Sequence, residues 1–108
     1  MEFEINGMKW TIKQVTQEQM NYDYGKDGYY THGYTCYSKN EIVINNTTPE
    51  PIRTLKHELT HLWLYAYGHC QDDKEFSNED VCEIVASSNE FINDIVERWR
   101  KENVKNKK

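Results

Sequence analysis

One segment near the middle of the chain constrains the fold most, because it has the residue pattern of a helix together with residues typical of a helix start and a helix end. Thr48 can serve as an N-cap, Pro49 suits the first helical position, and Pro51 is still tolerated within the first turn. Gly68 follows Tyr67 and is a residue type that commonly lies just beyond a helix end. We therefore expect one helix that begins at Pro49 and ends at about Tyr67.

This helix would carry an H-E-x-x-H pattern from His57 to His61. Each residue turns a helix by about 100°, so His61 lies about 40° and Glu58 about 100° from His57. Two histidines one turn apart can bring their ring nitrogens to one zinc ion at about 2.0–2.1 Å. Glu58 lies too far round to be a natural third ligand, but it is well placed to take a proton from a water molecule on the metal.

The apolar residues of the same helix lie on the side opposite the histidines, at about 140–220° from His57. They are Ile52, Leu55, Leu59, Leu62 and Ala66. A structural histidine usually lies at the edge of a core, whereas both of these lie away from the apolar stripe. The alternative is an ordinary solvated helix face, since a five-residue pattern also arises by chance.

A second helix is predicted from Ser77, as N-cap, through Trp99, with Asp80 at the position of a capping-box acid. Glu79 and Glu83 lie one turn apart on this helix, opposite an apolar stripe. The stripe consists of Val81, Ile84, Val85, Phe91, Ile92, Ile95 and Trp99. Either glutamate alone is equally consistent with an ordinary acidic first turn. A zinc site that lacks a third protein ligand makes both of them candidates.

H-E-L-T-H followed by Asn78-Glu79-x-x-x-Glu83 resembles the gluzincin pattern of thermolysin-like metallopeptidases. In size and order of elements the chain is similar to the small ImmA/IrrE-type metallopeptidases of phages and mobile elements. The resemblance is strongest over residues 41–86. It implies a zincin-like fold and a Zn²⁺ cofactor in a cytoplasmic hydrolase.

The same resemblance implies that His57, His61 and Glu79 bind zinc and that Glu83 orients His57. The family has Asp where this chain has Glu83, so Glu83 is the alternative third ligand. Glu58 would then be the catalytic general base in peptide-bond hydrolysis. The implied partner is a peptide or protein substrate, added to a sheet edge at residues 41–45 or 31–37.

Two other interpretations stay open at this point. The zinc could stabilise a non-catalytic protein-binding module, in which case His69 or Cys70 would fill the fourth position. The chain could also bind no metal. An oxyanion-stabilising group could come from His32 or from a tyrosine near the predicted sheet edge, and the sequence does not choose among Tyr29, Tyr30, Tyr34 and Tyr37.

The first 45 residues predict a small, mostly antiparallel sheet. Asn6-Gly7 is a strong two-residue hairpin turn, Gln17–Met20 can form a helical turn, and residues 31–37 and 41–45 have the composition of strands. Together with the two helices this gives one α+β domain over residues 1–108. The basic residues from 101 onward are expected to fray.

Charge and composition argue against several classes of partner. The length of 108 residues suits one domain, and the net charge of −5 argues against general nucleic-acid binding. No apolar run is long enough for a membrane span, and the acidic start of the chain does not look like a signal peptide. The three cysteines, of which Cys82 is expected to be buried, fit a reducing compartment.

Overall fold

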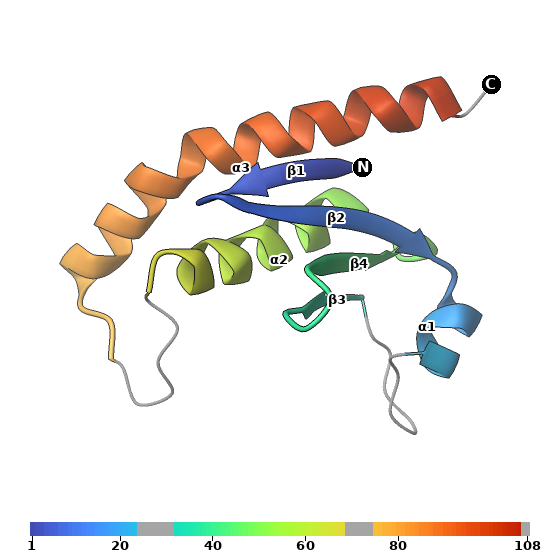
Figure 1. The fold of residues 1–108 in the computed structure, drawn as a ribbon, viewed down its shortest axis with the longest axis horizontal. Helices are drawn as coiled ribbons and strands as arrows, with labels where there is room; N and C mark the ends of the chain where they lie inside the picture. The colour runs from blue at the N-terminus through green and yellow to red at the C-terminus, as the bar shows by residue number, and fades with distance from the viewer. Residues whose placement is uncertain (24–31, 69–74, 107–108) are drawn as a thin grey trace.

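The computed structural model describes residues 1–23, 32–68 and 75–106. These residues form a four-stranded mixed sheet with helices, which confirms the expected α+β class. In Figure 1, α3 runs along the β1 side of the sheet and α1 lies beyond the end of β2. The elements in chain order are β1 (Glu2–Ile5), β2 (Met8–Val15), α1 (Gln17–Asp23), β3 (Gly33–Cys36), β4 (Glu41–Asn45), α2 (Pro51–Ala66) and α3 (Asn78–Asn106).

The first hairpin forms as its turn sequence predicts. Asn6 and Gly7 both have positive φ, 46° and 79°, which is the backbone of a tight turn between right-twisted strands. β1 and β2 pair antiparallel through this turn, with Phe3 opposite Trp10. Both of these aromatic side chains are buried, so the hairpin contributes one wall of the core.

The sheet has the order β1-β2-β4-β3, and its central pair is parallel. The expectation of a mostly antiparallel sheet holds for the β1–β2 and β3–β4 pairs but not for β2–β4. The parallel register brings Ile12 beside Ile42, and both join the main core. Val43 belongs to a second buried group with Val15 and Met20 of α1, so β4 carries buried side chains in both groups.

Helix α2 begins two residues later than its sequence predicts. Glu50 is the residue before the helix, and Pro51 takes the first-turn position that Pro49 was expected to fill. Thr48 is not the cap, because its hydroxyl donates to the backbone oxygen of Asn45 and stabilises the turn after β4. The predicted end is correct to within a residue.

The end of α2 is fixed by backbone conformation and by a contact from the first hairpin. Gly68 has a φ of 78°, which is the left-handed conformation expected just beyond a helix. Asn6 Nδ2 donates to the backbone oxygen of Ala66 at 2.8 Å and satisfies one of the terminal carbonyl groups. The β1–β2 turn and the end of the helix therefore stabilise each other.

Helix α3 begins with the capping box that the sequence predicts. The backbone N–H of Asp80 donates to Ser77 Oγ at 3.1 Å, and the N–H of Ser77 donates to the Asp80 carboxylate at 3.0 Å. The helix continues beyond Trp99 to Asn106, so residues 101–106 are helical rather than frayed. A contact of 2.5 Å between Gln14 Nε2 and Asn103 Oδ1 connects this last part of the helix to β2.

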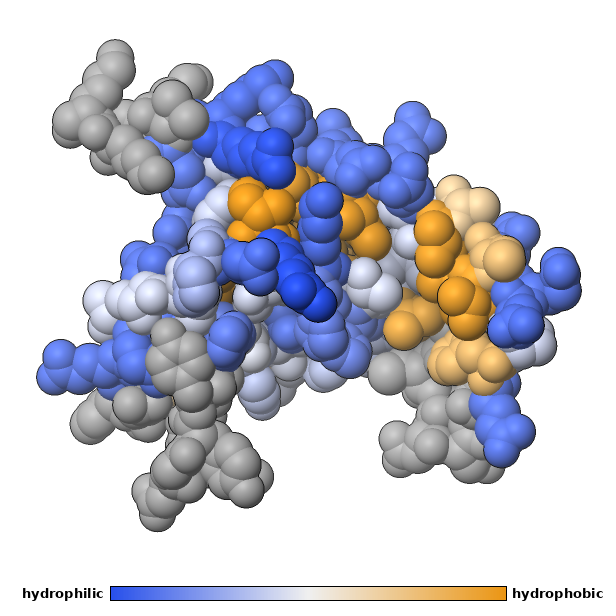
Figure 2. Space-filling view, turned by 180° about the vertical axis from the view of Figure 1, so that it is seen from behind, coloured by the Kyte–Doolittle hydropathy of each residue, from blue (hydrophilic) through white to orange (hydrophobic). Residues whose placement is uncertain are grey.

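The apolar stripe of α3 is buried over only one half of the helix. Ile92, Ile95, Val96 and Trp99 belong to the main core. Val81 and Val85, in contrast, are 49% and 58% exposed. Figure 2 shows apolar side chains at the surface on the side where α3 begins.

The described helices bear on the expected burial of Cys82 and on whether a helix could span a membrane. Cys82 lies in the exposed first half of α3, so the expectation that it is buried is wrong. None of the described helices combines the length and the apolar character that a membrane span requires.

Candidate metal centre

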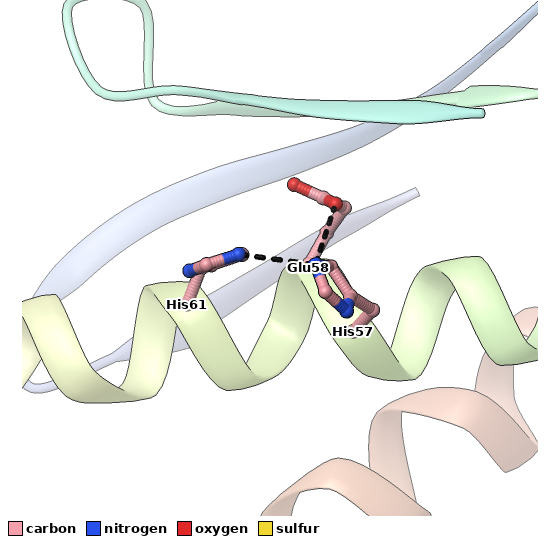
Figure 3. A group of neighbouring side chains, drawn as sticks. All are labelled: His57, Glu58 and His61. Atoms are coloured by element: carbon pink, nitrogen blue, oxygen red, sulfur yellow. Dashed lines mark hydrogen bonds and ion pairs between the residues drawn. The ribbon is translucent and has the colours of Figure 1, made fainter. Parts of the chain in front are cut away.

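His57, Glu58 and His61 form the one group of three or more side chains in the described part of the chain that could hold a metal ion (Figure 3). All three come from α2, and their ligand atoms lie within 4.8 Å of one another. The two histidine rings are 4.8 Å apart between centroids and inclined by 76°. The H-E-x-x-H spacing therefore places both imidazoles side by side at the helix surface, as predicted.

The distance between the two ring nitrogens fits a shared metal ion. His57 Nε2 and His61 Nε2 are 3.1 Å apart. Two nitrogen ligands at about 2.0–2.1 Å from a tetrahedral ion are separated by about 3.3 Å, so only a small adjustment is needed. Without a metal, the same distance permits a hydrogen bond only when one ring donates and the other accepts. The donor set and spacing thus suit a divalent transition-metal ion such as zinc.

Glu58 is buried beside these exposed rings. The residue is 8% exposed, whereas the side chain of His57 is 67% exposed. Oε1 of Glu58 accepts a hydrogen bond of 2.7 Å from the hydroxyl of Thr35, and Oε2 lies 3.9 Å from His57 Nε2. Figure 3 shows the carboxylate extending from α2 toward the strands of the sheet. One oxygen is therefore bound by the sheet while the other lies nearer the histidine pair.

The burial of Glu58 comes from the position of β3 beside α2. On the helical wheel Glu58 lies between the histidine face and the core stripe, together with Thr54 and Tyr65. Tyr65 packs against Tyr37, just after β3, with ring centroids 4.5 Å apart and ring planes inclined by 44°. β3 therefore covers the face of α2 that lies between the histidines and the core stripe. No local sequence pattern predicts that a strand covers this face.

Gly33 lets β3 approach α2 closely. Gly33 pairs with Ile44 and Thr35 with Ile42, so both strand positions face the same side of the sheet as the core. A Cβ atom at Gly33 would lie 2.6 Å from Thr54 Cγ2 and 3.2 Å from Glu58 Cγ. Only glycine fits at this separation, and neither Gly33 nor Thr35 was predicted as a site residue.

A pocket of about 380 Å³ opens next to the candidate metal centre. It lies between the start of β3 and the first turns of α2, and it includes His57 and Glu58 in its wall. His32 also lines it, which distinguishes His32 from the other oxyanion candidates predicted from the sequence. Arg53 contributes a positive charge to the wall and lies 3.8 Å from the carboxylate of Glu50.

The remaining predicted site residues lie elsewhere. Glu79 and Glu83 are exposed in the first turns of α3, and neither belongs to the group around His57. Glu83 instead accepts a hydrogen bond from Ser87 at 3.0 Å. Tyr34 and Tyr37 are partly exposed side chains outside the pocket wall. The candidates Tyr29, Tyr30, His69 and Cys70 lie outside the described residues.

No protein-family model matches this chain, and no curated protein or solved structure is significantly similar to it. Functional inference therefore depends on the side chains of the site itself.

Proposed function

We propose that this chain is a zinc-dependent metallopeptidase in a zincin-like fold, in which His57 and His61 bind the metal. The observation that carries the proposal is the 3.1 Å separation of the two Nε2 atoms beside a buried carboxylate. A hydrogen-bonded histidine pair at the surface would need no buried acid next to it. A hydrolytic site needs one, because a base must be within reach of the attacking water.

When bound, zinc would polarise the substrate carbonyl group and lower the pKa of a coordinated water to about 7. Glu58 would take the proton of the attacking water on Oε2, the oxygen nearer to His57. The same carboxyl group would then give this proton to the nitrogen of the leaving amine. His32, from the pocket wall, is the candidate for stabilising negative charge on the carbonyl oxygen.

The substrate that we propose is a peptide or an extended segment of a protein, acted on in the cytoplasm. β3 is the last strand in the order β1-β2-β4-β3, so its outer side has no partner strand among the described residues. An extended peptide could add to this edge through main-chain hydrogen bonds and lie across the pocket. Of the two strands considered from the sequence, β3 rather than β4 is an edge strand of the described sheet.

Glu79 remains our proposal for the third protein ligand, with Glu83 as the alternative. Both lie in the part of α3 where Val81 and Val85 are exposed and Ile84 packs against the core, so a displacement of these first turns would break few core contacts. Binding through Glu79 requires such a displacement, because neither carboxylate joins the histidines in the structure.

Metal content and hydrolysis, measured on matched variants, test the proposed function. The wild type should bind one zinc ion and cleave a quenched-fluorescent peptide library. Glu58→Gln should keep the zinc and lose about 10²–10⁴-fold in rate, since the amide cannot accept a proton. Glu79→Gln should lose most of the zinc, with Glu90→Gln, at an exposed position of the same helix, as the control.

Two results would contradict parts of the proposal. Full zinc content in Glu79→Gln would exclude Glu79 as a ligand, and Glu83→Gln would then identify the alternative. Stoichiometric zinc without any peptide cleavage, together with zinc loss on substitution of His69 or Cys70, would favour the non-catalytic protein-binding module.

A further inference from the structure

We propose that Thr35 is a positioning residue for Glu58, holding one carboxylate oxygen so that the other faces the histidine pair. This inference rests on the proposed function, because Thr35 would affect hydrolysis only through Glu58. It adds a role for a strand residue that lies 23 positions from the helix residue it contacts.

The hydrogen bond between the two side chains is short and shielded from water. Thr35 Oγ1 lies 2.7 Å from Glu58 Oε1, and the two residues are 9% and 8% exposed. An ionised carboxylate only accepts hydrogen bonds, so the hydroxyl must be the donor. The hydroxyl is also 3.5 Å from the backbone oxygen of Glu58, but its single proton belongs to the shorter contact.

The geometry leaves Oε2 as the oxygen available for proton transfer. Oε2 lies 3.9 Å from His57 Nε2, on the side of the candidate metal centre. A glutamate has several rotatable bonds, and a free carboxylate would sample many orientations. With Oε1 bound by Thr35, the carboxylate is already oriented when substrate arrives, which is how a positioned base increases rate.

Thr35 is itself held firmly enough to serve this purpose. It pairs with Ile42 in the β3–β4 ladder, which fixes its backbone. The neighbouring Gly33 lacks the Cβ atom that would separate β3 from α2. The strand therefore reaches α2 at the distance that a threonine hydroxyl needs to contact Glu58.

Two substitutions separate the hydroxyl from the shape of the side chain. Thr35→Val keeps the volume and removes the donor, whereas Thr35→Ser keeps the donor and removes a methyl group. In the zinc-loaded protein, Thr35→Val should lower kcat about 10–100-fold, in line with the effect of misplacing a catalytic group. KM and zinc content should stay unchanged, and Thr35→Ser should stay within about threefold of the wild-type kcat.

Thr48→Val is the matched control. Thr48 is also buried, its hydroxyl donates to the backbone oxygen of Asn45 at 3.0 Å, and its side chain is not part of the pocket wall. It should lower the melting temperature about as much as Thr35→Val does and leave kcat unchanged. Equal losses of kcat in Thr35→Val and Thr35→Ser, or no loss in Thr35→Val, would overturn the positioning role.

Crystal structures of the two Thr35 variants provide a readout independent of activity. The Glu58 carboxylate should move away from its present orientation in Thr35→Val and keep it in Thr35→Ser; an unmoved carboxylate in Thr35→Val overturns the inference. Should Thr35→Val not fold, Thr35→Ala gives the same comparison. If the zinc-loaded wild type cleaves no peptide, the proposed function fails, and these structures alone decide whether Thr35 orients Glu58.

Discussion

At the scale of single residues, the site combines one feature visible in the sequence with one that is not. The spacing of His57 and His61 follows from the helical repeat alone, so their meeting is predictable. The burial of Glu58 is not, because it depends on Gly33 and Thr35 of a strand whose position beside α2 has no local signal. Sequence periodicity reports which side of a helix is apolar, but not which other element covers its flanks.

Gly33→Ala tests the close approach of β3 to α2. The new methyl group would lie 2.6 Å from Thr54 Cγ2, so we expect a loss of about 1–3 kcal/mol in unfolding free energy. Thr54→Ser removes that Cγ2 atom and keeps the hydroxyl, which donates to the backbone oxygen of Glu50. The double variant should therefore recover part of the loss in urea unfolding.

Gly7→Ala is the control for the comparison of Gly33→Ala, Thr54→Ser and their double variant. Gly7 has a φ of 79°, but a Cβ atom at this position would have no neighbouring atom within 4 Å. Its substitution therefore costs backbone strain of about 1–2 kcal/mol and causes no clash. The effects of Thr54→Ser and Gly7→Ala on the free energy of unfolding should add. If the effects of Thr54→Ser and Gly33→Ala also add, Thr54 is not what limits the approach of β3 to α2.

At the scale of elements, local chemistry predicts helix ends well where the capping side chains bond within the first turn of their own helix. Ser77 and Asp80 exchange the two hydrogen bonds of a capping box, and Gly68 adopts the expected left-handed conformation. Thr48 has the right residue type for a cap but instead bonds to Asn45 in the turn after β4. A nearby acceptor thus overrides capping preference, and the helix starts at Pro51.

Ser77→Ala tests how the first half of α3 is stabilised. Removing the cap should lower the stability of the start of α3 by about 1 kcal/mol. Because Val81 and Val85 are exposed, this loss should appear as faster hydrogen exchange in the first turns of α3, with little change in global stability.

Ser87→Ala is the control for the cap. Its hydroxyl bonds to the Glu83 side chain rather than to the backbone, and alanine is the better helix former. Exchange in the first turns should stay the same or slow down. If hydrogen exchange in the first turns became equally faster in both variants, the cap would have no special role in stabilising them.

At the scale of the whole molecule, the class of the fold is predictable but the order of its strands is not. Alternation and turn signals predict strands at the correct places, and helix α2 carries its apolar stripe as expected. The parallel pairing of β2 with β4 depends on where the chain returns after α1 and β3, which no local pattern specifies. In the same way, the stripe of α3 predicts an apolar side but not that half of it lies at the surface.

Substitutions in the two halves of α3 should therefore differ in their effect on stability. Ile95→Ala removes a side chain that is 2% exposed, so we expect a loss of about 2–5 kcal/mol in urea unfolding. Val85→Ala, at a position 58% exposed, should change stability by no more than about 0.5 kcal/mol. A large loss for Val85→Ala would show that this part of α3 is packed against another surface in solution.

The placement of the site within one stretch of sequence has a consequence for the folding pathway. Thr35, His57, Glu58 and His61 belong to β3 and α2, which together with β4 are consecutive elements, whereas β1 and β2 join them through contacts more distant in sequence, such as the β2–β4 pairing and the hydrogen bond from Asn6 to Ala66. Contacts between nearby segments form with a smaller loss of chain entropy than distant ones. We therefore expect β3, β4 and α2 to assemble first, so that His57, Glu58 and His61 acquire their geometry before the first hairpin docks, an order that pulse-labelled hydrogen exchange during refolding would reveal.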